Sequence, residues 1–302
     1  MGILDCIGNT PLVRIENINP NPKVKLFAKL EGNNPGGSVK DRIALYMVNT
    51  AEKEGKLTRD KIILEATSGN TGIGLAMVAS AKKYRVKLTM PACVSIERRR
   101  VLEAFGAELI LSPSKEGTDG AIMLAHKIME EDPQLYFMPN QFDNPSNILA
   151  HYETTGKEII EQTGGKITHF IAGMGTTGTV MGAGKRLKEF NKDICVIGVE
   201  PIMGHRIQGL KNMSEAIVPK IFDPSKLDER YIVNDEEAFD VTRRLAVKEG
   251  IFAGMSSGAA MHAALMKSSE LDEGVIVVIL PDRGDRYLST ALFTSVCSKC
   301  PP

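Results

Sequence analysis

The stretch KIILEATSGNTGIGLAMVASAKKY, residues 61–84, contains the pattern that decides the fold prediction. A short run of β-branched and other apolar residues is followed by a turn of Thr, Ser, Gly and Asn, and then by a helical pattern. A strand that leads through a tight turn into a helix is the start of a βαβ unit. The stretch therefore predicts a strand over residues 61–66 and a helix over residues 73–84.

The same unit recurs along the chain, at residues 87–107, 168–190 and 275–290. Strands that alternate with helices of this length favour parallel sheets and an α/β protein. A cluster of Pro, Asn and Asp at residues 134–147 is the best candidate for a crossing between two such domains. Because ligands of α/β sheets bind beyond the carboxyl ends of the strands, we expect the Gly-rich turns to meet at one cleft.

The composition is that of a globular protein. Of the 302 residues, 43% are apolar, and 37 basic residues balance 37 acidic ones. This balance argues against a nucleic-acid or membrane-surface partner, since either would favour a basic excess. No run approaches the roughly 18 apolar residues of a transmembrane helix, and the first residues lack the pattern of a signal peptide. We therefore expect a cytoplasmic protein.

Neither the cysteines nor the histidines show the spacing of a metal site, and we expect no metal. Cys297 and Cys300 form a C-x-x-C pair, but a zinc site needs four ligands and no second pair accompanies them. An exposed tail with reducible thiols is the simpler interpretation, and a redox or metal role stays open. The chain has no G-x-S-x-G motif, which argues against acyl transfer by serine.

The turn GMGTTGT, residues 173–179, matches the G-x-G-x-x-G motif of dinucleotide-binding sites. Glu200 lies about where such a site places its ribose-binding acid, so an NAD-dependent dehydrogenase is one hypothesis. The turn also offers three threonine hydroxyls and backbone N–H groups at a predicted helix N-terminus. Because every oxygen of a terminal monophosphate needs a donor, we favour a monophosphate site.

The turn TSGNTG, residues 67–72, is a second donor-rich turn at a predicted helix start. Hydroxyls, an amide and exposed N–H groups converge there and suit a carboxylate. Helix capping is the alternative, because Ser, Thr and Asn are good capping residues. One such residue would be enough for a cap and the turn has four, so we favour a carboxylate-binding loop.

The stretch NNPGGSVKDR, residues 33–42, places Lys40 in the first turn of a predicted helix, where Ser38 and Asp41 have the spacing of a capping box. A free lysine has a pKa of about 10.4 and is almost fully charged at pH 7. A helix N-terminus and burial both disfavour the ammonium and raise the neutral, nucleophilic fraction. Together with a monophosphate site, Lys40 predicts an aldehyde-bearing cofactor with one phosphate, which is pyridoxal 5'-phosphate.

Motifs spanning nearly all of the chain occur in the order found in one known family: GNTPLVRI, NNPGGSVKDR, EATSGNTGIGLAM, SIERRRVLEAFGAEL, GMGTTGTVMGAG, GMSSGAA and DRGDRYLST. With these motifs the chain resembles the cysteine synthase (O-acetylserine sulfhydrylase) family of fold-type II pyridoxal-phosphate enzymes. The segments LEGNNP, QFDNPSNILAHYETTG and PDRGDRYLST are more similar to its B-type members.

The resemblance implies a role for each candidate site residue. Lys40 forms the internal aldimine and, once displaced by the substrate, moves the α-proton. Asn70 hydrogen-bonds the ring hydroxyl oxygen of the cofactor, and Asp282 lies near its pyridine nitrogen. The cofactor phosphate is bound by Gly175, Thr176, Thr177, Gly178 and Thr179. The substrate carboxylate is bound by Thr67, Ser68, Gly69, Thr71 and Gln141, in a region that closes over it.

The resemblance also implies an architecture of two three-layer α/β domains with largely parallel, twisted sheets and the cofactor in the cleft between them. Residues 1–11 and 36–143 are expected to form the N-terminal domain, which carries the lysine and the substrate loop. Residues 12–35 and 144–302 are expected to form the C-terminal domain, which carries the phosphate loop.

The implied reaction is β-replacement on O-acetyl-L-serine, or a similarly activated serine, with sulfide, through an external aldimine and an α-aminoacrylate, to give L-cysteine. Alternatives within the class are cystathionine β-synthase activity with homocysteine and the use of O-phosphoserine or thiosulfate. A catalytically silent relative that acts as a binding partner is a further alternative. A homodimer is expected, and association with a serine acetyltransferase stays open.

Two features depart from the pattern of many relatives. Asp282 stands where many relatives have a serine, and an aspartate there would favour a protonated ring nitrogen and a stronger electron sink. The segment PIMGHRIQGLKN, residues 201–212, is the expected substrate lid and carries His205, Arg206 and Lys211. These basic residues would suit a bulkier sulfur donor or a phosphorylated serine, and a solvated lid is the alternative.

Overall fold

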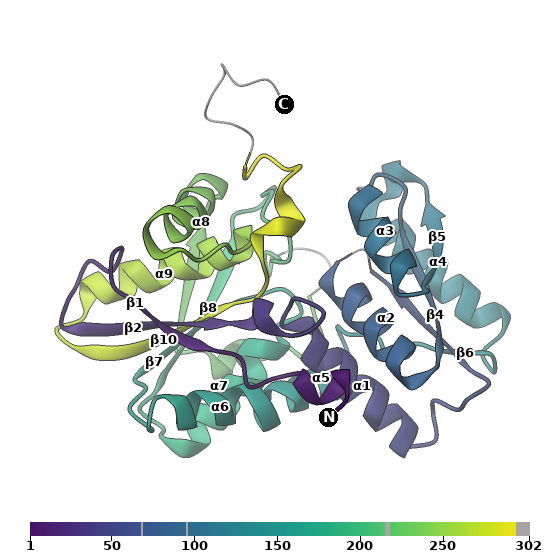
Figure 1. Ribbon diagram of the computed structural model, residues 1–302, viewed down its shortest axis with the longest axis horizontal. Coiled ribbons are helices and arrows are strands. Elements are labelled where there is room, and N and C mark those ends of the chain that lie inside the picture. Colours follow the sequence, from purple (N-terminus) through teal and green to yellow (C-terminus); the bar gives the residue numbers. More distant parts are fainter. Residues whose placement is uncertain (68, 95, 215–217, 294–302) are drawn as a thin grey trace.

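The computed structural model describes residues 1–67, 69–94, 96–214 and 218–293. Ser68, Cys297 and Cys300, which the sequence analysis singled out, lie outside these residues. Strands and helices alternate along the chain and are arranged in two lobes that lie side by side (Figure 1). The lobes contain one sheet each.

The larger sheet has the strand order β1-β2-β10-β7-β8-β9. Its strands are β1 (Leu12–Ile15), β2 (Val24–Leu30), β7 (His169–Gly173), β8 (Cys195–Pro201), β9 (Glu229–Val233) and β10 (Gly274–Leu280). Neighbouring strands are parallel except for β1, which pairs with β2 in the antiparallel sense.

The smaller sheet has the strand order β5-β4-β3-β6 and is parallel throughout. Its strands are β3 (Ile62–Ala66), β4 (Arg85–Pro91), β5 (Glu108–Ser112) and β6 (Tyr136–Phe137). The strand predicted over residues 61–66 is therefore confirmed as β3. The Pro- and Asn-rich segment 134–147 contains β6 and leads into a helix.

The α-helices are α1 (Lys40–Lys53), α2 (Asn70–Lys82), α3 (Ile96–Ala104), α4 (Gly117–Glu131), α5 (Pro145–Ala150), α6 (Gly156–Gln162), α7 (Gly178–Phe190), α8 (Asp235–Glu249) and α9 (Met255–Glu270). The shorter helical turns are η1 (Ile3–Cys6), η2 (Glu31–Asn33), η3 (Ser114–Glu116), η5 (Pro224–Lys226) and η6 (Gly284–Tyr287), and η4 (His151–Thr155) is a π-helix.

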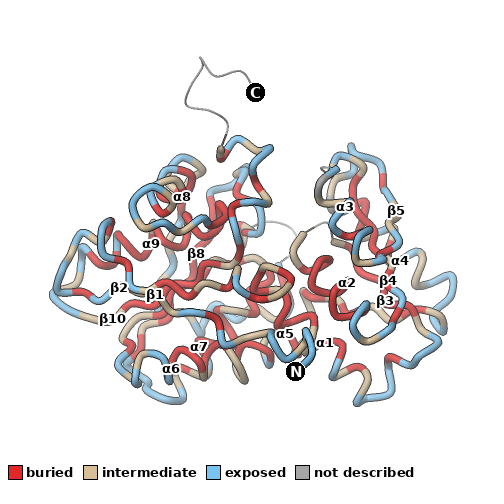
Figure 2. The backbone as a smooth tube through the Cα atoms, in the orientation of Figure 1, coloured by how far each residue is buried: buried red, intermediate tan, exposed pale blue. Residues whose placement is uncertain are grey.

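Both faces of the larger sheet are covered by helices. On β10, Val278 packs in a core with residues of α8 and α9, whereas its neighbour Val277 packs in a second core with residues of α7. Successive side chains of a strand point to opposite faces, so a strand buried on both sides is apolar throughout, as the run VIVVIL is. Figure 2 shows the resulting burial of the central strands.

The smaller sheet is covered in the same way. Ile63 packs with residues of α1 and α2, and its neighbour Ile62 packs with residues of α4. Each lobe therefore has three layers, and the predicted α/β architecture with largely parallel sheets is confirmed.

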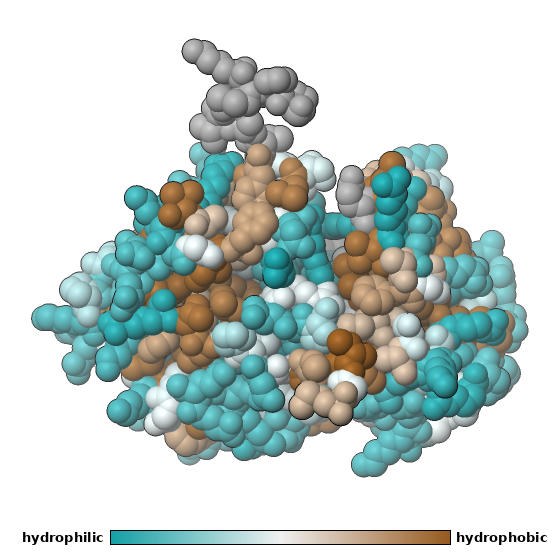
Figure 3. Space-filling view, viewed as in Figure 1, coloured by the Kyte–Doolittle hydropathy of each residue, from teal (hydrophilic) through white to brown (hydrophobic). Residues whose placement is uncertain are grey.

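The face of the molecule shown in Figure 3 is mostly hydrophilic, with smaller hydrophobic areas, and it is indented between the two lobes. In the part of the chain that the structure describes, we find no helix with the length and apolar character needed to cross a membrane.

Candidate active site

Lys40 is the first residue of α1, and its amine reaches the loop that follows β7. The Nζ atom lies 3.4 Å from Oγ1 of Thr176, a residue 136 positions away in the sequence. Burial lowers the pKa of the Lys40 amine to about 8, although the nearby Asp282 carboxylate opposes this shift. More of the amine is therefore neutral near physiological pH, which suits a nucleophile or a base.

The predicted capping box at the start of α1 is wrong. The Asp41 carboxylate accepts a hydrogen bond from Gly36 N at 2.6 Å, and the Ser38 hydroxyl accepts one from Lys40 N at 3.2 Å. The chain turns at Gly37, whose φ is +81°, and this turn brings Gly36 N within reach of Asp41. A Cβ on Gly36 would lie 2.5 Å from Asp41 Oδ1, so the contact requires glycine.

The predicted phosphate loop connects the end of β7 to the start of α7. Thr176 and Thr177 are buried, and Thr177 has a φ of +67° at the position before the helix. The Thr177 hydroxyl oxygen is buried and has no hydrogen-bond partner among the described residues. A hydroxyl free to donate, next to the N–H groups and positive dipole end of α7, makes this loop suitable for an anion.

Two glycines of this loop allow close approaches that a side chain would prevent. A Cβ on Gly175 would lie 2.3 Å from the carbonyl oxygen of Gly209, and a Cβ on Gly178 would lie 1.8 Å from Oδ1 of Asn147. Both distances are far shorter than any non-bonded contact of a carbon atom. The loop therefore packs directly against α5 and against the predicted lid.

The predicted carboxylate-binding turn, residues 67–72, follows β3 and includes the first three residues of α2. The N-cap residue of α2 is Gly69, which has no side chain, and its N–H donates to Thr67 Oγ1 at 3.3 Å. No side chain among the described residues of this turn caps the helix in the structure, so the capping alternative does not account for them. Their donors are placed at the end of a parallel strand, where α/β proteins bind ligands.

The side-chain amide of Asn147 links Gln141, and through it Thr71, to the phosphate loop. Thr71 Oγ1 donates to Gln141 Oε1 at 2.6 Å. Asn147 Nδ2 donates to the carbonyl oxygen of Gln141 at 2.8 Å and to Thr176 Oγ1 at 3.0 Å. Asn147 is fully buried, so it joins the predicted substrate-binding and phosphate-binding residues into one constellation.

Asp282 follows β10 and faces the same region. Its Oδ2 atom accepts hydrogen bonds from Tyr287 OH at 2.5 Å and from Asn70 Nδ2 at 2.6 Å, and Arg286 donates to Asn70 Oδ1. Burial raises the pKa of the Asp282 carboxyl, against the effect of these bonds. Its second oxygen, Oδ1, is buried and has no hydrogen-bond partner among the described residues.

Comparison with known proteins places this chain in a family. The model of the family described as "Pyridoxal-phosphate dependent enzyme" matches residues 3–282. The chain is 49% identical to the cysteine synthase of Aquifex aeolicus, over 97% of this chain and 92% of that protein. It is 47% identical to cysteine synthase B of Escherichia coli, over 95% and 94%. The chain belongs to the cysteine synthase family of pyridoxal-phosphate dependent enzymes.

A solved structure agrees with this membership. The crystal structure of cysteine synthase from Entamoeba histolytica superposes with a TM-score of 0.92 at 40% identity, over 97% of this chain and 90% of that one. The resemblance noted in the sequence is therefore confirmed, as is pyridoxal phosphate as the cofactor. The dinucleotide interpretation of the turn at Gly173, Gly175 and Gly178 is not favoured. Glu200 instead accepts hydrogen bonds from Met213 N and from Arg230.

The residues of this family member fit the cofactor, as two buried atoms indicate. Thr177 Oγ1 lacks a partner in the loop predicted to hold the phosphate, and Asp282 Oδ1 lacks one where the pyridine nitrogen is expected. A phosphate oxygen accepts from a hydroxyl, and a protonated ring nitrogen donates to a carboxylate, so each group would satisfy the atom it meets. Leaving a buried polar atom without a hydrogen bond lowers the stability of the folded protein. A cofactor group that pairs with each of these two oxygens would remove that cost.

Sequence reasoning did not identify three residues that support the constellation. Asn147 joins the two loops, and His151 Nε2 lies 3.2 Å from Oγ1 of Thr179 in the phosphate loop. Glu65 Oε2 accepts a hydrogen bond from Asn140 N at 2.8 Å and so holds the residue before Gln141. The segment QFDNPSNILAHYETTG contains the first two, but the sequence assigned them no role in the site, because their partners are distant in the chain.

In the predicted lid, the basic side chains of Arg206 and Lys211 contact neighbouring elements. Arg206 Nε pairs with Asp235 Oδ2 at 2.9 Å, at the start of α8, and Lys211 Nζ lies 5.5 Å from the centre of the Phe142 ring.

Among the described residues, no group of three or more His, Cys, Asp and Glu side chains is arranged to bind a metal ion.

Proposed function

We propose that this protein is a cysteine synthase that catalyses β-replacement on O-acetyl-L-serine with sulfide, giving L-cysteine and acetate. The observation that supports this most directly is the convergence of the Lys40 amine with the Thr176 hydroxyl, 3.4 Å away, and with the nearby Asp282 carboxylate. The identity of 49% and 47% to two cysteine synthases, over nearly the whole chain, supports the same substrates.

When bound, pyridoxal phosphate withdraws electrons from the α-carbon of the substrate and so makes the α-proton removable. Lys40 Nζ is the amine that would hold the cofactor covalently. Once released by the substrate amine, the Lys40 amine would take the α-proton as a base, for which a pKa of about 8 is suitable. Acetate would then leave Cβ with the bonding electron pair, sulfide would bond to Cβ in its place, and the protonated Lys40 amine would return the proton to Cα.

The remaining site residues bind and orient. We propose that the phosphate is held by Gly175, Thr176, Thr177, Gly178 and Thr179, and that the substrate carboxylate is held by Thr67, Ser68, Gly69, Thr71 and Gln141. Asn70 has a second amide hydrogen besides the one donated to Asp282, and this hydrogen is suited to the ring oxygen of the cofactor. Asp282 Oδ1 would accept from the ring nitrogen and keep it protonated.

We further propose the domain division into residues 1–11 with 36–143 and residues 12–35 with 144–302. It is supported by the sheets, because β1 and β2 belong to the larger sheet although they precede α1 in the chain.

We also propose that the protein works as a cytoplasmic homodimer. Association with a serine acetyltransferase is a separate question that a pull-down with that enzyme would answer.

The test is the visible absorption of the purified protein during substrate addition. The protein should carry an absorption band in the visible range, and O-acetyl-L-serine should replace that band with a new one that sulfide then reverses, with release of L-cysteine. Parallel additions of O-phosphoserine, and of thiosulfate or homocysteine as acceptors, rank the alternatives. A coloured protein that ignores O-acetyl-L-serine but responds to O-phosphoserine would overturn the proposed substrate.

A further inference from the structure

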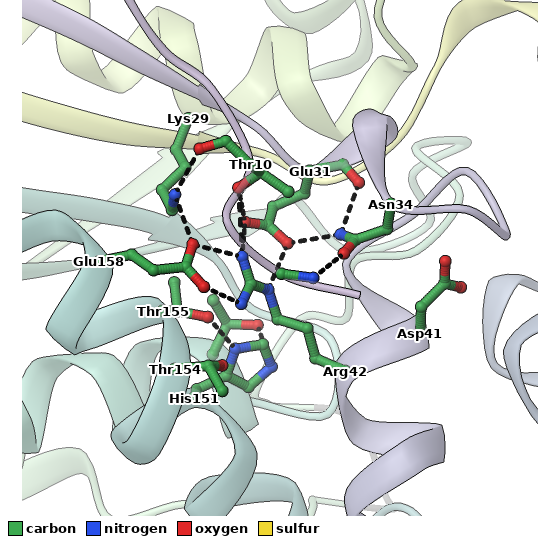
Figure 4. Close-up of polar contacts among 12 residues, drawn as sticks. Thr10, Lys29, Glu31, Asn34, Asp41, Arg42, His151, Thr154, Thr155 and Glu158 are labelled. Carbon is green, nitrogen blue, oxygen red and sulfur yellow. Dashed lines mark hydrogen bonds and ion pairs between the residues drawn. The ribbon is translucent and has the colours of Figure 1, made fainter. Parts of the chain in front are cut away.

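Two residues after Lys40, the guanidinium of Arg42 lies in a buried group of four charged side chains (Figure 4). We call Lys29, Glu31, Arg42 and Glu158 the buried charge cluster. The side chains of Lys29, Glu31 and Arg42 are 0% exposed and that of Glu158 is 10% exposed. Two positive and two negative charges balance, which is the condition under which charges are tolerated in an interior.

Arg42 uses both edges of its guanidinium. It binds Glu31 through Nε–Oε2 at 2.7 Å and Nη2–Oε1 at 2.8 Å. It binds Glu158 through Nη1–Oε1 at 2.6 Å and Nη2–Oε2 at 2.8 Å. Each pair is bidentate, and bidentate pairs fix orientation as well as distance. The Arg42 side chain is therefore held in one plane by carboxylates on two different elements.

Lys29 belongs to the same cluster but does not hold α1. Its Nζ atom donates to Thr10 O at 2.9 Å and to Gln162 Oε1 at 2.9 Å, and lies 2.7 Å from Glu158 Oε2. An ammonium has three hydrogens, and these contacts use all of them. Lys29 is thus a natural comparison for Arg42, with the same charge and burial and a shared partner.

The cluster connects the helix that carries Lys40 to the other lobe. Arg42 lies in α1, Glu31 directly follows β2 of the larger sheet, and Glu158 lies in α6. Helix α6 packs against α7, whose first residue, Gly178, belongs to the phosphate loop. The two bidentate pairs therefore tie the first turn of α1 to the elements that position this loop.

The geometry of α1 relates this tie to the amine. Residues of an α-helix are rotated by about 100° each, so Arg42 and Lys40 project about 200° apart, on nearly opposite sides. Helix α2 approaches the same turn closely, since a Cβ on Gly74 would lie 3.1 Å from the Lys40 carbonyl oxygen. With Arg42 held on one side and α2 packed against the backbone, the turn has little freedom to rotate.

We propose that Arg42 is a positioning residue, which fixes the first turn of α1 through Glu31 and Glu158 and so directs the Lys40 amine at the phosphate loop. Stability alone is a weak reason for such a cluster, because buried ion pairs can often be replaced by apolar residues without loss of stability. The inference rests on the proposed role of Lys40 as the cofactor-binding amine.

The test compares Arg42→Lys with Lys29→Met in the full-length protein, both loaded with pyridoxal phosphate and after its removal. Arg42→Lys keeps the charge but cannot form two bidentate pairs, whereas Lys29→Met removes a charge from the same cluster without touching α1. Three quantities are measured: the melting temperature, the ratio of circular dichroism to absorbance in the visible band, and the rate at which the cofactor-free protein takes up cofactor.

We expect Arg42→Lys to slow cofactor uptake by about tenfold or more and to change the dichroism ratio, because small misplacements of reacting groups are costly. We expect Lys29→Met to lower the melting temperature but to keep both cofactor readouts near those of the wild type. If both variants change the cofactor readouts in proportion to their melting temperatures, the cluster is only structural and the proposal is wrong.

Two additions keep the outcome decisive. If Arg42→Lys does not fold, Glu31→Gln, which keeps the side-chain shape and removes one charge bound by Arg42, takes its place with the same expectation. Borohydride reduction of the wild type followed by peptide mapping should find the cofactor on Lys40. A different labelled lysine would overturn the proposed function itself, which separates that failure from failure of the Arg42 proposal.

Discussion

The Lys40 amine lies 3.4 Å from the Thr176 hydroxyl oxygen, so the first residue of α1 meets the loop between β7 and α7. Each residue lies at or just before the N-terminus of its own helix, Lys40 at the start of α1 and Thr176 two residues before α7. Their meeting places a nucleophilic amine beside a site for an anion. The predictions below test the parts of this arrangement separately.

Lys40→Ala should abolish the visible absorption band and lower turnover by about a hundredfold or more, because the covalent link and the base are both lost. The far-ultraviolet circular dichroism should stay unchanged. Lys53→Ala, at the exposed end of the same helix, is the control and should keep the band and the activity. A Lys40→Ala protein with the full band would contradict the assignment.

Cofactor uptake by the cofactor-free protein should depend on pH through Lys40. The pKa of this amine is lowered to about 8, and only the neutral amine attacks an aldehyde. The uptake rate should therefore rise with pH and level off above about pH 8, well below the value for an ordinary lysine of about 10.4. Stopped-flow absorbance, recorded from about pH 6 to about pH 10, measures the pH at which the uptake rate reaches half its maximum.

Asp282→Asn should slow α-proton removal from O-acetyl-L-serine by about tenfold or more. This factor corresponds to the free energy of one charge-assisted hydrogen bond. The amide keeps the shape of the side chain but no longer stabilises a protonated ring nitrogen. Tyr287→Phe is the comparison, because it removes one hydrogen bond to Oδ2 and leaves the carboxylate in place. Rapid-mixing absorbance gives both rates, and equal rates in the two variants would argue against the role of Asp282.

Gly178→Ala should weaken cofactor binding strongly, because the new Cβ would lie 1.8 Å from Asn147 Oδ1 and force α5 and the phosphate loop apart. Asn147 would lose its bonds to Gln141 and Thr176, so the substrate affinity should fall as well. Equilibrium titration with pyridoxal phosphate measures the effect. The same substitution at Gly2, where the nearest atom lies 3.9 Å from the new Cβ, should change nothing.

Glu65 should make the protein less stable as the pH rises. Burial raises the pKa of its carboxyl from 4.5 to about 8, so between these values the folded protein keeps a proton that the unfolded chain has released. Stability then falls with increasing pH, with a limiting slope of about 1.4 kcal/mol per pH unit. Glu65→Gln, which is always neutral, should remove this loss.

Urea unfolding of the wild type and of Glu65→Gln at a series of pH values between these limits measures the difference. Glu103→Gln, at an exposed position, should follow the wild type at every pH. Parallel curves for the wild type and Glu65→Gln would show that the Glu65 carboxyl is ionised in the folded protein throughout.

The turns that carry the site were predictable because each is a local pattern. Strand β3, the turn at Thr67 and the start of α2 follow one another within the chain, and so do β7, the loop at Thr176 and α7. The capping box was predicted wrongly from equally local information. Ser38 and Asp41 have the spacing of a capping box. The turn at Gly37, however, brings Gly36 N to the Asp41 carboxylate, which therefore accepts from Gly36 N and not from Ser38 N.

The family resemblance supplied Asp282 and Gln141, which no spacing rule would have selected. Asn147, Glu65 and Arg42 were not predicted, since each acts on a partner far along the chain or on a different element. Asn147 is 29 positions from Thr176, and Arg42 is 116 positions from Glu158. Contacts at such separations exist only once the sheets have formed and packed.

The sequence by itself determined the alternation of strands and helices, the donor-rich turns and the presence of a lysine at a helix start, because these depend on neighbours within a few residues. The tertiary structure alone decided which turns meet, how Lys40 is aimed, and which charges are buried together. The reason is physical: the low pKa of Lys40 and the pairing of Arg42 with two carboxylates arise from burial among distant segments, and burial is a property of the packed molecule.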